Sequence, residues 1–273
     1  MANISDFLLV SDLDQTLLNS EHKLSDANRQ AINDYLKRGG QFTIATGRGL
    51  ASLKLLEIPT SHPMITHNGG AIYDFKEKKL LWHRAMEREN SKTIIKDVLK
   101  EFPGVGVEWV TTEKYYIVST NEEVKWHLDF ELLHREYPDS VDSISEDCIK
   151  ILFLWDEGRI AEVDKYLKKR IGEGMPFSFS YSFSTIMEFM SKDSNKGVAL
   201  AAFCELFKIP IEKTIAVGDN INDIEFLKRA GYAIAVENAL DEVKEVADLI
   251  VTNNNNNAIA DVIGRILKGE ISV

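Results

Sequence analysis

The chain has 273 residues, of which 44% are hydrophobic and 27% are charged, so it can bury a substantial core as one large domain or two smaller ones. Its formal net charge is −11, and a uniformly acidic chain repels phosphate backbones, which argues against non-specific nucleic-acid binding. No stretch approaches the ~20 apolar residues of a membrane span, and the first ten residues lack the pattern of a secretory signal. We therefore expect a cytoplasmic protein, with Cys148 and Cys204 as reduced thiols.

The first third of the chain alternates strand and helix patterns. Residues 7–10 and 42–45 are short apolar runs typical of buried parallel strands, and residues 64–66 predict another strand. Between the first two runs, Ser25 is placed as the N-cap of a helix that ends at a pair of glycines. Such alternation indicates parallel βαβ units.

The last third repeats this rhythm and ends with an asparagine tract. Residues 253–257 are five asparagines before an apolar helical pattern, which we interpret as a turn and a helix N-cap rather than a binding site. The predicted helices cover residues 196–207 and 223–229, and the predicted strands cover residues 214–217, 232–236 and 249–251.

The middle of the chain lacks this rhythm and is typical of a separate α+β domain. We therefore predict a doubly wound, Rossmann-like α/β core made of residues 1–82 and 185–273, with an α+β domain inserted over residues 83–184. In and beside this insertion we expect strands at residues 105–110, 115–119, 149–155, 177–181 and 185–189, and a helix at residues 122–137.

Polar residues that could carry chemistry follow the predicted strands or open the predicted helices. Asp12 and Asp14 come directly after the first strand, and their alternation lets both side chains point the same way. Ligands of open α/β sheets bind beyond the carboxyl ends of the strands, where this pair lies. By itself the pair is equally typical of a turn with capping side chains.

A second segment follows the next strand of the core. Thr46 offers a hydroxyl group, Gly47 allows a close backbone approach, and Arg48 offers a planar fork for an oxyanion. Alone, this segment is more typical of a capped helix start.

Two further segments open helices in the last third. Lys196 stands in the first turn of a helix, where its positive charge is unfavourable unless it faces an anion or a group of carboxylates. Asp219 and Asp223, with Asn222 between them, form a cluster of hard oxygen ligands that suits Mg²⁺. A solvated lysine and simple helix caps are the structural alternatives.

In this order, the segments DLDQT, TGR, SNKG and GDNIND match the four motifs of the haloacid dehalogenase-like phosphatases, and the chain resembles their Cof-type branch. The resemblance covers essentially the whole chain, because the insertion has the length of that branch's large α+β cap domain. The run Asn68-Gly69-Gly70-Ala71 resembles the branch's Asn-Gly-rich turn. Gln15 departs from the pattern, since the family usually has Gly there, and this puts substrate detail in doubt.

The resemblance implies a Mg²⁺-dependent phosphatase that acts on a small phosphorylated metabolite, with sugar phosphates as the favoured substrates. Asp12 would be the nucleophile and form an aspartyl-phosphate, while Asp14 would be a general acid that is neutral when substrate arrives. The resemblance also implies phosphate contacts from Leu13, Thr46, Gly47, Arg48, Lys196 and Asn222, and Mg²⁺ ligation by Asp12, the backbone carbonyl of Asp14, Asp219 and Asp223.

Charge also indicates a cation, independently of the resemblance. Four ionised aspartates and Lys196 leave three net negative charges, which would repel a phosphate dianion. One Mg²⁺ ion and one proton on Asp14 bring the sum to zero, and phosphoryl transfer depends largely on such electrostatic stabilisation.

Two other functions remain open: a non-catalytic regulator that binds a phosphorylated metabolite, and a phosphomutase with the same chemistry. A dinucleotide-dependent enzyme is unlikely, since no G-x-G-x-x-G follows the first strand. The oligomeric state cannot be read from the sequence. Aromatic residues of the cap domain are candidates for leaving-group selection, although core packing is their more typical role: Trp109, Tyr115, Tyr116, Trp126 and Trp155.

Overall fold

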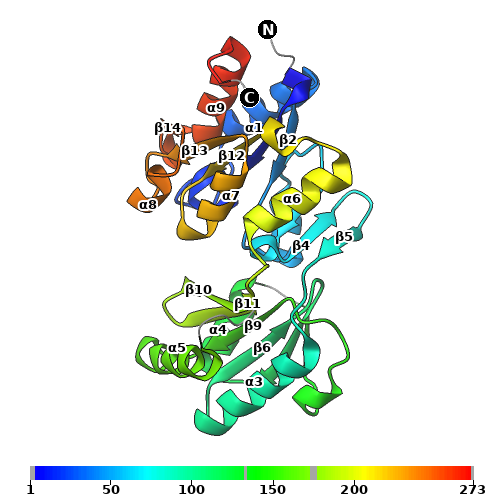
Figure 1. Cartoon of the computed structure of the whole chain (residues 1–273), viewed down its shortest axis with the longest axis vertical. Helices are drawn as coiled ribbons and strands as arrows, with labels where there is room; N and C mark the ends of the chain where they lie inside the picture. The colour runs from blue at the N-terminus through cyan, green and yellow to red at the C-terminus, as the bar shows by residue number, and fades with distance from the viewer. Residues whose placement is uncertain (1–3, 132–133, 173–176, 272–273) are drawn as a thin grey trace. The chain divides into compact units, whose positions relative to one another are not determined.

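The structure, a computed structural model, describes residues 4–131, 134–172 and 177–271. The chain divides into two compact units, whose helices and strands are labelled in Figure 1. Unit 1 comprises Met1–Arg48, Lys54–Trp82 and Asn195–Val273, and unit 2 comprises Gly49–Leu53 and His83–Ser194.

Unit 1 is built on a parallel sheet, as the sequence predicts, and this sheet has five strands, because the strand at residues 64–66 joins a separate sheet. Its strand order is β14-β13-β12-β1-β2, so the first strand of the chain lies beside a strand from the last third. All of these strands are short and mostly buried, which explains their nearly continuous apolar sequences. Their bounds are β1 Leu8–Ser11, β2 Gln41–Ile44, β12 Thr214–Gly218, β13 Tyr232–Val236 and β14 Leu249–Val251.

Helices cover both faces of this sheet. Crossovers from β1 to β2 and from β12 to β13 run in opposite directions along the sheet, so right-handed connections put α1 and α7 on opposite faces. Accordingly, α1 packs against α9 and α6 packs against α7 (Figure 1). The strand order therefore reverses between β12 and β1. The helices are α1 Asp26–Lys37, α6 Lys196–Phe207, α7 Ile224–Arg229, α8 Asp241–Lys244 and α9 Ala258–Lys268.

Local sequence signals explain the ends of α1. The backbone N–H of Asn28 donates to the Ser25 hydroxyl at 3.1 Å, which confirms Ser25 as the N-cap. The helix stops before Gly39, whose φ of +88° lies in the left-handed region that glycine tolerates. A small second sheet follows β2 along the chain and contains β3 Met64–Thr66, β4 Ala71–Asp74 and β5 Lys79–His83.

The asparagine tract forms the predicted turn, but it does not cap the last helix. The Asn253 side chain accepts a hydrogen bond from the backbone N–H of Asn256 at 3.1 Å and so closes the turn. Asn257 stands at the N-cap position of α9 with φ of +63° and makes no side-chain capping bond there.

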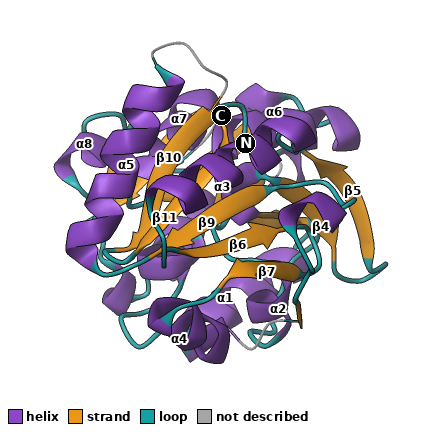
Figure 2. Cartoon of the chain, turned by 90° about the horizontal axis from the view of Figure 1, so that it is seen from below, coloured by secondary structure: helices purple, strands orange, loops and turns teal. Residues whose placement is uncertain are grey.

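Unit 2 is a six-stranded mixed sheet of order β10-β11-β9-β6-β7-β8. Apolar residues of α3 and α5 pack with strand residues in one hydrophobic cluster, and Figure 2 shows both helices against the sheet. Since β11 pairs with β9 and β10, this unit extends beyond the expected boundary at residue 184. Its elements are α2 Leu50–Lys54, α3 Arg88–Glu101, β6 Gly106–Val110, β7 Tyr115–Ser119, α4 Glu122–Glu131, β8 Arg135–Glu136, β9 Lys150–Leu154, α5 Glu157–Ile171, β10 Phe177–Phe183 and β11 Ile186–Ser191.

The helix predicted over residues 122–137 is shorter in the structure. α4 ends at Glu131, and β8 forms a parallel pair with β7 instead. The backbone N–H of Tyr115 also donates to the His134 carbonyl at 3.0 Å. Strand pairing therefore replaces helix at residues 135–136, a long-range effect that helical spacing does not report. Residues 132–133 lie outside the described residues.

Core packing is confirmed for three of the five aromatic candidates. Trp109, Tyr115 and Tyr116 are buried in the two hydrophobic clusters of unit 2. Trp155 is partly buried against one of them, with the Arg159 guanidinium 4.7 Å from its ring centroid. Trp126 differs, because it is 44% exposed and meets the Phe183 ring edge-on at 5.2 Å.

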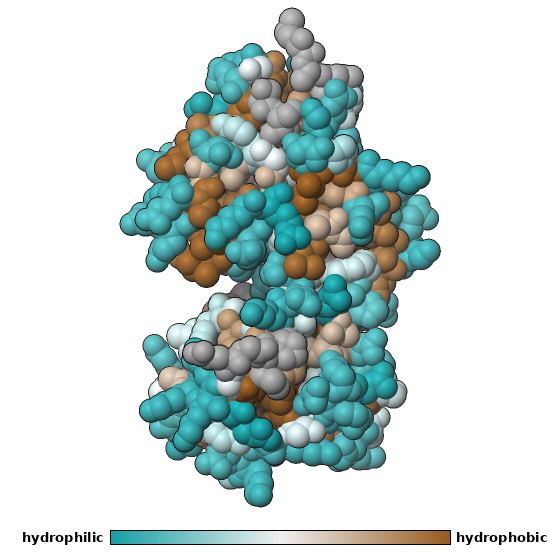
Figure 3. Space-filling view, in the orientation of Figure 1, coloured by the Kyte–Doolittle hydropathy of each residue, from teal (hydrophilic) through white to brown (hydrophobic). Residues whose placement is uncertain are grey.

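Both cysteines are free and buried, as expected. Hydrophilic side chains cover much of the face drawn in Figure 3, with smaller hydrophobic areas among them. Within the described ranges, every helix is too short or too polar to cross a bilayer.

The close packing of α6 against α7 can be tested at Gly197, where a Cβ atom would lie 2.4 Å from the Glu225 carbonyl oxygen. We expect Gly197→Ala to destabilise unit 1 by about 1–3 kcal/mol, because backbone must move to admit the methyl group. Gly264→Ala is the matched control, since a Cβ there meets nothing within 4 Å in the middle of α9. The control should be neutral or stabilising by up to about 1 kcal/mol. Thermal melts that rank the two variants in the opposite order would contradict this packing.

Candidate active site

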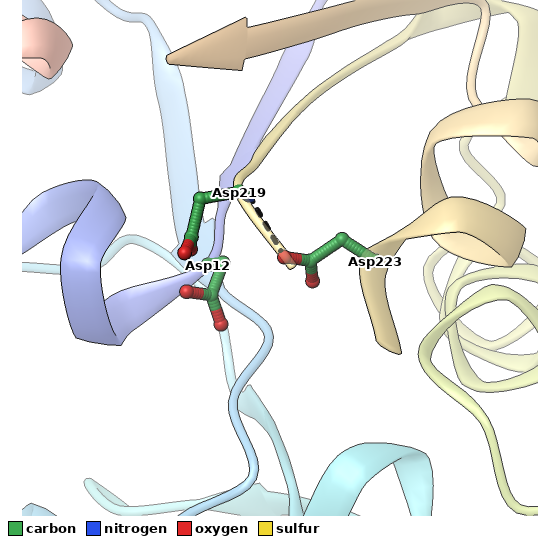
Figure 4. Close-up of side chains that lie close together, drawn as sticks. All are labelled: Asp12, Asp219 and Asp223. Carbon is green, nitrogen blue, oxygen red and sulfur yellow. Dashed lines mark hydrogen bonds between the residues drawn. The ribbon is translucent and has the colours of Figure 1, made fainter. Parts of the chain in front are cut away.

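Three buried aspartates meet at the carboxyl edge of the parallel sheet. Asp12 follows β1 and Asp219 follows β12, two strands that are paired in parallel. The backbone N–H of Asp12 donates to the Val217 carbonyl at 2.8 Å, which ties the two strand ends together. One carboxylate oxygen from each of Asp12, Asp219 and Asp223 lies within 4.8 Å of the other two (Figure 4). This is the point where the strand order reverses, the usual ligand site of such sheets.

Asp223 shapes the loop that carries Asp219. It stands in a short turn at the start of α7, and its Oδ2 accepts hydrogen bonds from the backbone N–H groups of Asp219 at 3.0 Å and Asn220 at 3.2 Å. The first of these is the dashed line in Figure 4. Asp223 is fully buried, so its remaining oxygen needs a partner inside the protein.

Lys196 is that partner. It is the first residue of α6, its side chain is completely buried, and its ammonium group donates to Oδ1 of Asp223 at 2.6 Å and to Oδ1 of Asp12. Burial lowers the pKa of Lys196, but the two carboxylates outweigh this and raise its pKa above the usual value. The predicted reason for a lysine at a helix start is therefore correct, because it faces carboxylates.

The cluster retains excess negative charge. Burial raises the pKa of Asp12 well above its usual range, and the neighbouring Asp223 and Asp219 add to this against the lowering effect of Lys196. Burial likewise raises the pKa of Asp219 to about 6, although the Thr16 hydroxyl donates to it at 2.7 Å. With all three carboxylates ionised, Lys196 leaves two net negative charges. An oxygen-only donor set with that charge fits one divalent cation such as Mg²⁺.

Asp14 does not join this cluster with its side chain. It belongs to the wide turn Leu13–Leu17. The Arg48 guanidinium donates two hydrogen bonds to its carboxylate, from Nε to Oδ2 at 2.8 Å and from Nη2 to Oδ1 at 2.5 Å. His22 Nδ1 lies 3.3 Å from Oδ1 of the same carboxylate. Burial raises the pKa of Asp14, but the hydrogen bonds and charge of Arg48 and His22 outweigh it, so the pKa is lower than usual.

The sequence predicts that Asp14 is neutral when substrate arrives and that Arg48 contacts the phosphate. In the structure the two side chains pair with each other. A bound phosphate would compete with Asp14 for Arg48, so both roles stay predictions for the substrate-bound protein.

The segment after β2 approaches the Asn-Gly turn. Thr46 is buried, its hydroxyl accepts from the backbone N–H of Arg48 at 3.1 Å, and its carbonyl accepts from the backbone N–H of Asn68 at 2.9 Å. A Cβ atom on Gly47 would lie 2.8 Å from Oδ1 of Asn68, so a larger residue there would push the Asn68 side chain out of this position. The same Oδ1 accepts from the Asn222 amide at 2.9 Å.

Sequence reasoning missed the roles of Thr16 and Asn68 in this site. Thr16 lies inside the first motif, and its hydroxyl group, four residues after Asp12, is the sequence feature that could have predicted its hydrogen bond to Asp219. Asn68 has a left-handed φ of +54°, which asparagine tolerates better than most residues and which aims its amide between Gly47 and Asn222.

Comparisons with known proteins agree with this geometry. The chain is 29% identical to the 5-amino-6-(5-phospho-D-ribitylamino)uracil phosphatase YwtE of Bacillus subtilis, over 95% of this chain and 97% of the relative. It is also 29% identical to the phosphatase YcsE of the same organism, named for the same substrate, over 94% of both chains. The crystal structure of TM0651 from Thermotoga maritima superposes with a TM-score of 0.84 at 28% identity, covering 98% of each chain.

The family model for haloacid dehalogenase-like hydrolases matches residues 9–263, which include all four motifs and the inserted unit. The chain therefore belongs to the haloacid dehalogenase-like hydrolases and is a phosphatase of their Cof-type branch.

Proposed function

We propose that this phosphatase is Mg²⁺-dependent and hydrolyses small phosphorylated metabolites through an aspartyl-phosphate on Asp12. The observation that carries the proposal is the buried cluster in which Lys196 bridges Asp12 and Asp223 beside Asp219. A merely structural role is a poor explanation, because burying three carboxylates with one ammonium group leaves uncompensated charge.

The carboxylates of Asp12, Asp219 and Asp223, with the backbone carbonyl of Asp14, would hold the Mg²⁺ ion. When bound, the ion supplies the positive charge that lets a phosphate dianion approach. Lys196 keeps Asp12 in place and balances part of its charge as the phosphoryl group arrives.

In the first step, a carboxylate oxygen of Asp12 attacks phosphorus and the bond from phosphorus to the leaving oxygen breaks. Asp14 gives its proton to that leaving oxygen, so the alcohol departs neutral. In the second step, water attacks phosphorus, Asp14 takes a proton from the water, and inorganic phosphate leaves as the Asp12 carboxylate is restored.

Phosphoryl contacts would come from residues of all four motifs. The proposed donors are the backbone N–H groups of Leu13 and Gly47, the Thr46 hydroxyl, and the side chains of Lys196 and Asn222. Arg48 has to release Asp14 before Asp14 can donate a proton, and the phosphoryl group of the substrate offers Arg48 an alternative partner. This exchange would reconcile the two roles proposed for Arg48 and Asp14.

Unit 2 would act as the cap domain that selects the leaving group. The identity of the substrate can be tested directly by measuring phosphate release from candidate compounds. Sugar phosphates remain a prediction, and the names of YwtE and YcsE add 5-amino-6-(5-phospho-D-ribitylamino)uracil as a second candidate. We suggest a phosphate-release screen over both classes, ranked by kcat/KM. Tight binding without turnover would favour the regulator, and phosphoryl transfer to a second sugar hydroxyl would favour the mutase.

Removal of the metal gives the most direct test of the charge argument. We expect EDTA to abolish hydrolysis of p-nitrophenyl phosphate and added Mg²⁺ to restore it, because the cluster otherwise repels the phosphate dianion. Unchanged turnover in excess chelator would remove the cation from the mechanism.

The nucleophile can be tested by trapping. When the wild type is quenched rapidly in acid, mass spectrometry should detect the phosphorylated protein. Asp12→Asn should abolish both turnover and this phosphorylated species. A variant that still forms the covalent phosphoprotein would show that another residue is the nucleophile.

The general acid has a separate signature. Asp14→Asn should leave the fold and Mg²⁺ binding nearly intact and lower kcat by at least ~100-fold, the scale of general acid–base catalysis. Circular dichroism and Mg²⁺ titration are the controls. Turnover close to that of the wild type would mean that Asp14 is not the acid.

A further inference from the structure

Gln15, the residue that departs from the family pattern, adopts an unfavourable backbone conformation in the turn that carries Asp14. Its φ of 60° and ψ of 6° lie in the left-handed region, where glycine fits without strain and glutamine does not. A strained residue persists only where its surroundings hold it in place.

Two asparagines from distant segments hold both the main chain and the side chain of Gln15. The Asn238 amide donates to the backbone carbonyl of Gln15 at 2.8 Å, and the Asn254 amide donates to its side-chain Oε1 at 3.3 Å. Asn254 also donates to the Leu18 carbonyl at 3.0 Å, so its amide bonds to the turn at both Gln15 and Leu18. The two asparagines are themselves joined, since the backbone N–H of Asn254 donates to Oδ1 of Asn238 at 2.9 Å.

These contacts connect three loops at the same edge of the sheet. Gln15 follows β1, Asn238 follows β13, and Asn254 follows β14. Asn254 is only 3% exposed, so loss of its amide would leave buried acceptors without a donor. Asn254 belongs to the asparagine tract, whose sequence signature alone indicated only a turn.

We propose that Gln15, Asn238 and Asn254 form an amide clamp that positions Asp14 for proton transfer to the leaving group. The proposal rests on the general-acid role of Asp14 given above. The clamp holds the residue next to Asp14 on its main chain and side chain, so it defines where the Asp14 carboxylate can lie. Asn254 and Asn238 are positioning residues, because neither has to touch the substrate.

The proposal predicts a dependence on the leaving group that a general loss of stability would not produce. p-Nitrophenolate leaves readily without a proton, whereas an alkoxide requires one. We expect Asn254→Ala to lower kcat by about tenfold or more for the alkyl phosphate that the wild type hydrolyses fastest, and by less than about threefold for p-nitrophenyl phosphate. KM and the Mg²⁺ concentration for half-maximal activity should stay near wild-type values.

Asn256→Ala is the matched control. Asn256 lies in the same tract and is exposed, and its backbone N–H donates to the side chain and the carbonyl of Asn253, contacts that an alanine keeps. This variant should hydrolyse both substrates at wild-type rates. Asn238→Ala is the second test variant, since Asn238 is exposed and its substitution should be tolerated even if Asn254→Ala fails to fold.

The results separate failure of the clamp from failure of the proposed function. Asp14→Asn should show the same preference for the good leaving group, but more strongly. If it does and the folded clamp variants lose activity equally on both substrates, or lose none, the clamp is wrong. If Asp14→Asn itself shows no such preference, the general-acid assignment is wrong, and the clamp loses its basis for that reason.

Discussion

The bridge from the Lys196 ammonium group to Asp12 and Asp223 is the interaction on which the site depends. It is fully buried, so the lysine needs both carboxylates to remain charged inside the protein. Buried ion pairs contribute little net stability, because desolvation offsets most of their attraction. The bridge is therefore better explained by its positioning role, because it holds the start of α6, the end of β1 and the turn before α7 close together.

The parallel sheet makes that meeting point possible. Parallel strands end at the same edge, and the strand order reverses between β12 and β1, where sheets of this kind bind their ligands. Thr16 and Asp219 are 203 positions apart in the chain, yet their side chains share a hydrogen bond. A fold with this geometry needs only apolar runs of the right length in its strands, whereas the loops at their ends must supply specific side chains.

Sequence reasoning predicted what depends on local signals and missed what depends on long-range pairing. The strands at residues 232–236 and 249–251 and the helix at residues 196–207 have the predicted bounds, since apolar runs and capping residues are local. The sequence does not predict the pairing of Asp14 with Arg48, because it assigns Asp14 to proton transfer and Arg48 to the phosphate. Neither spacing nor composition reports which side chains meet. The end of α4 was missed for the same reason, as pairing with β7 decides it.

All of the proposed chemical groups lie in unit 1, and this division constrains where substrate choice can arise. In the proposed mechanism, the cluster would recognise only the phosphoryl group and the cation, features that every phosphate monoester substrate would share. Discrimination between a sugar phosphate and a phosphoribitylaminouracil therefore has to come from groups that meet the leaving group. Among the described residues, unit 2 carries exposed aromatic side chains that include the edge-on pair of Trp126 and Phe183. If unit 2 selects the leaving group, as proposed, a planar heterocycle could stack on such rings, whereas a sugar would gain less from them. Under that proposal, the relative rates on these two substrate classes report on unit 2, while the metal and the aspartates report on unit 1.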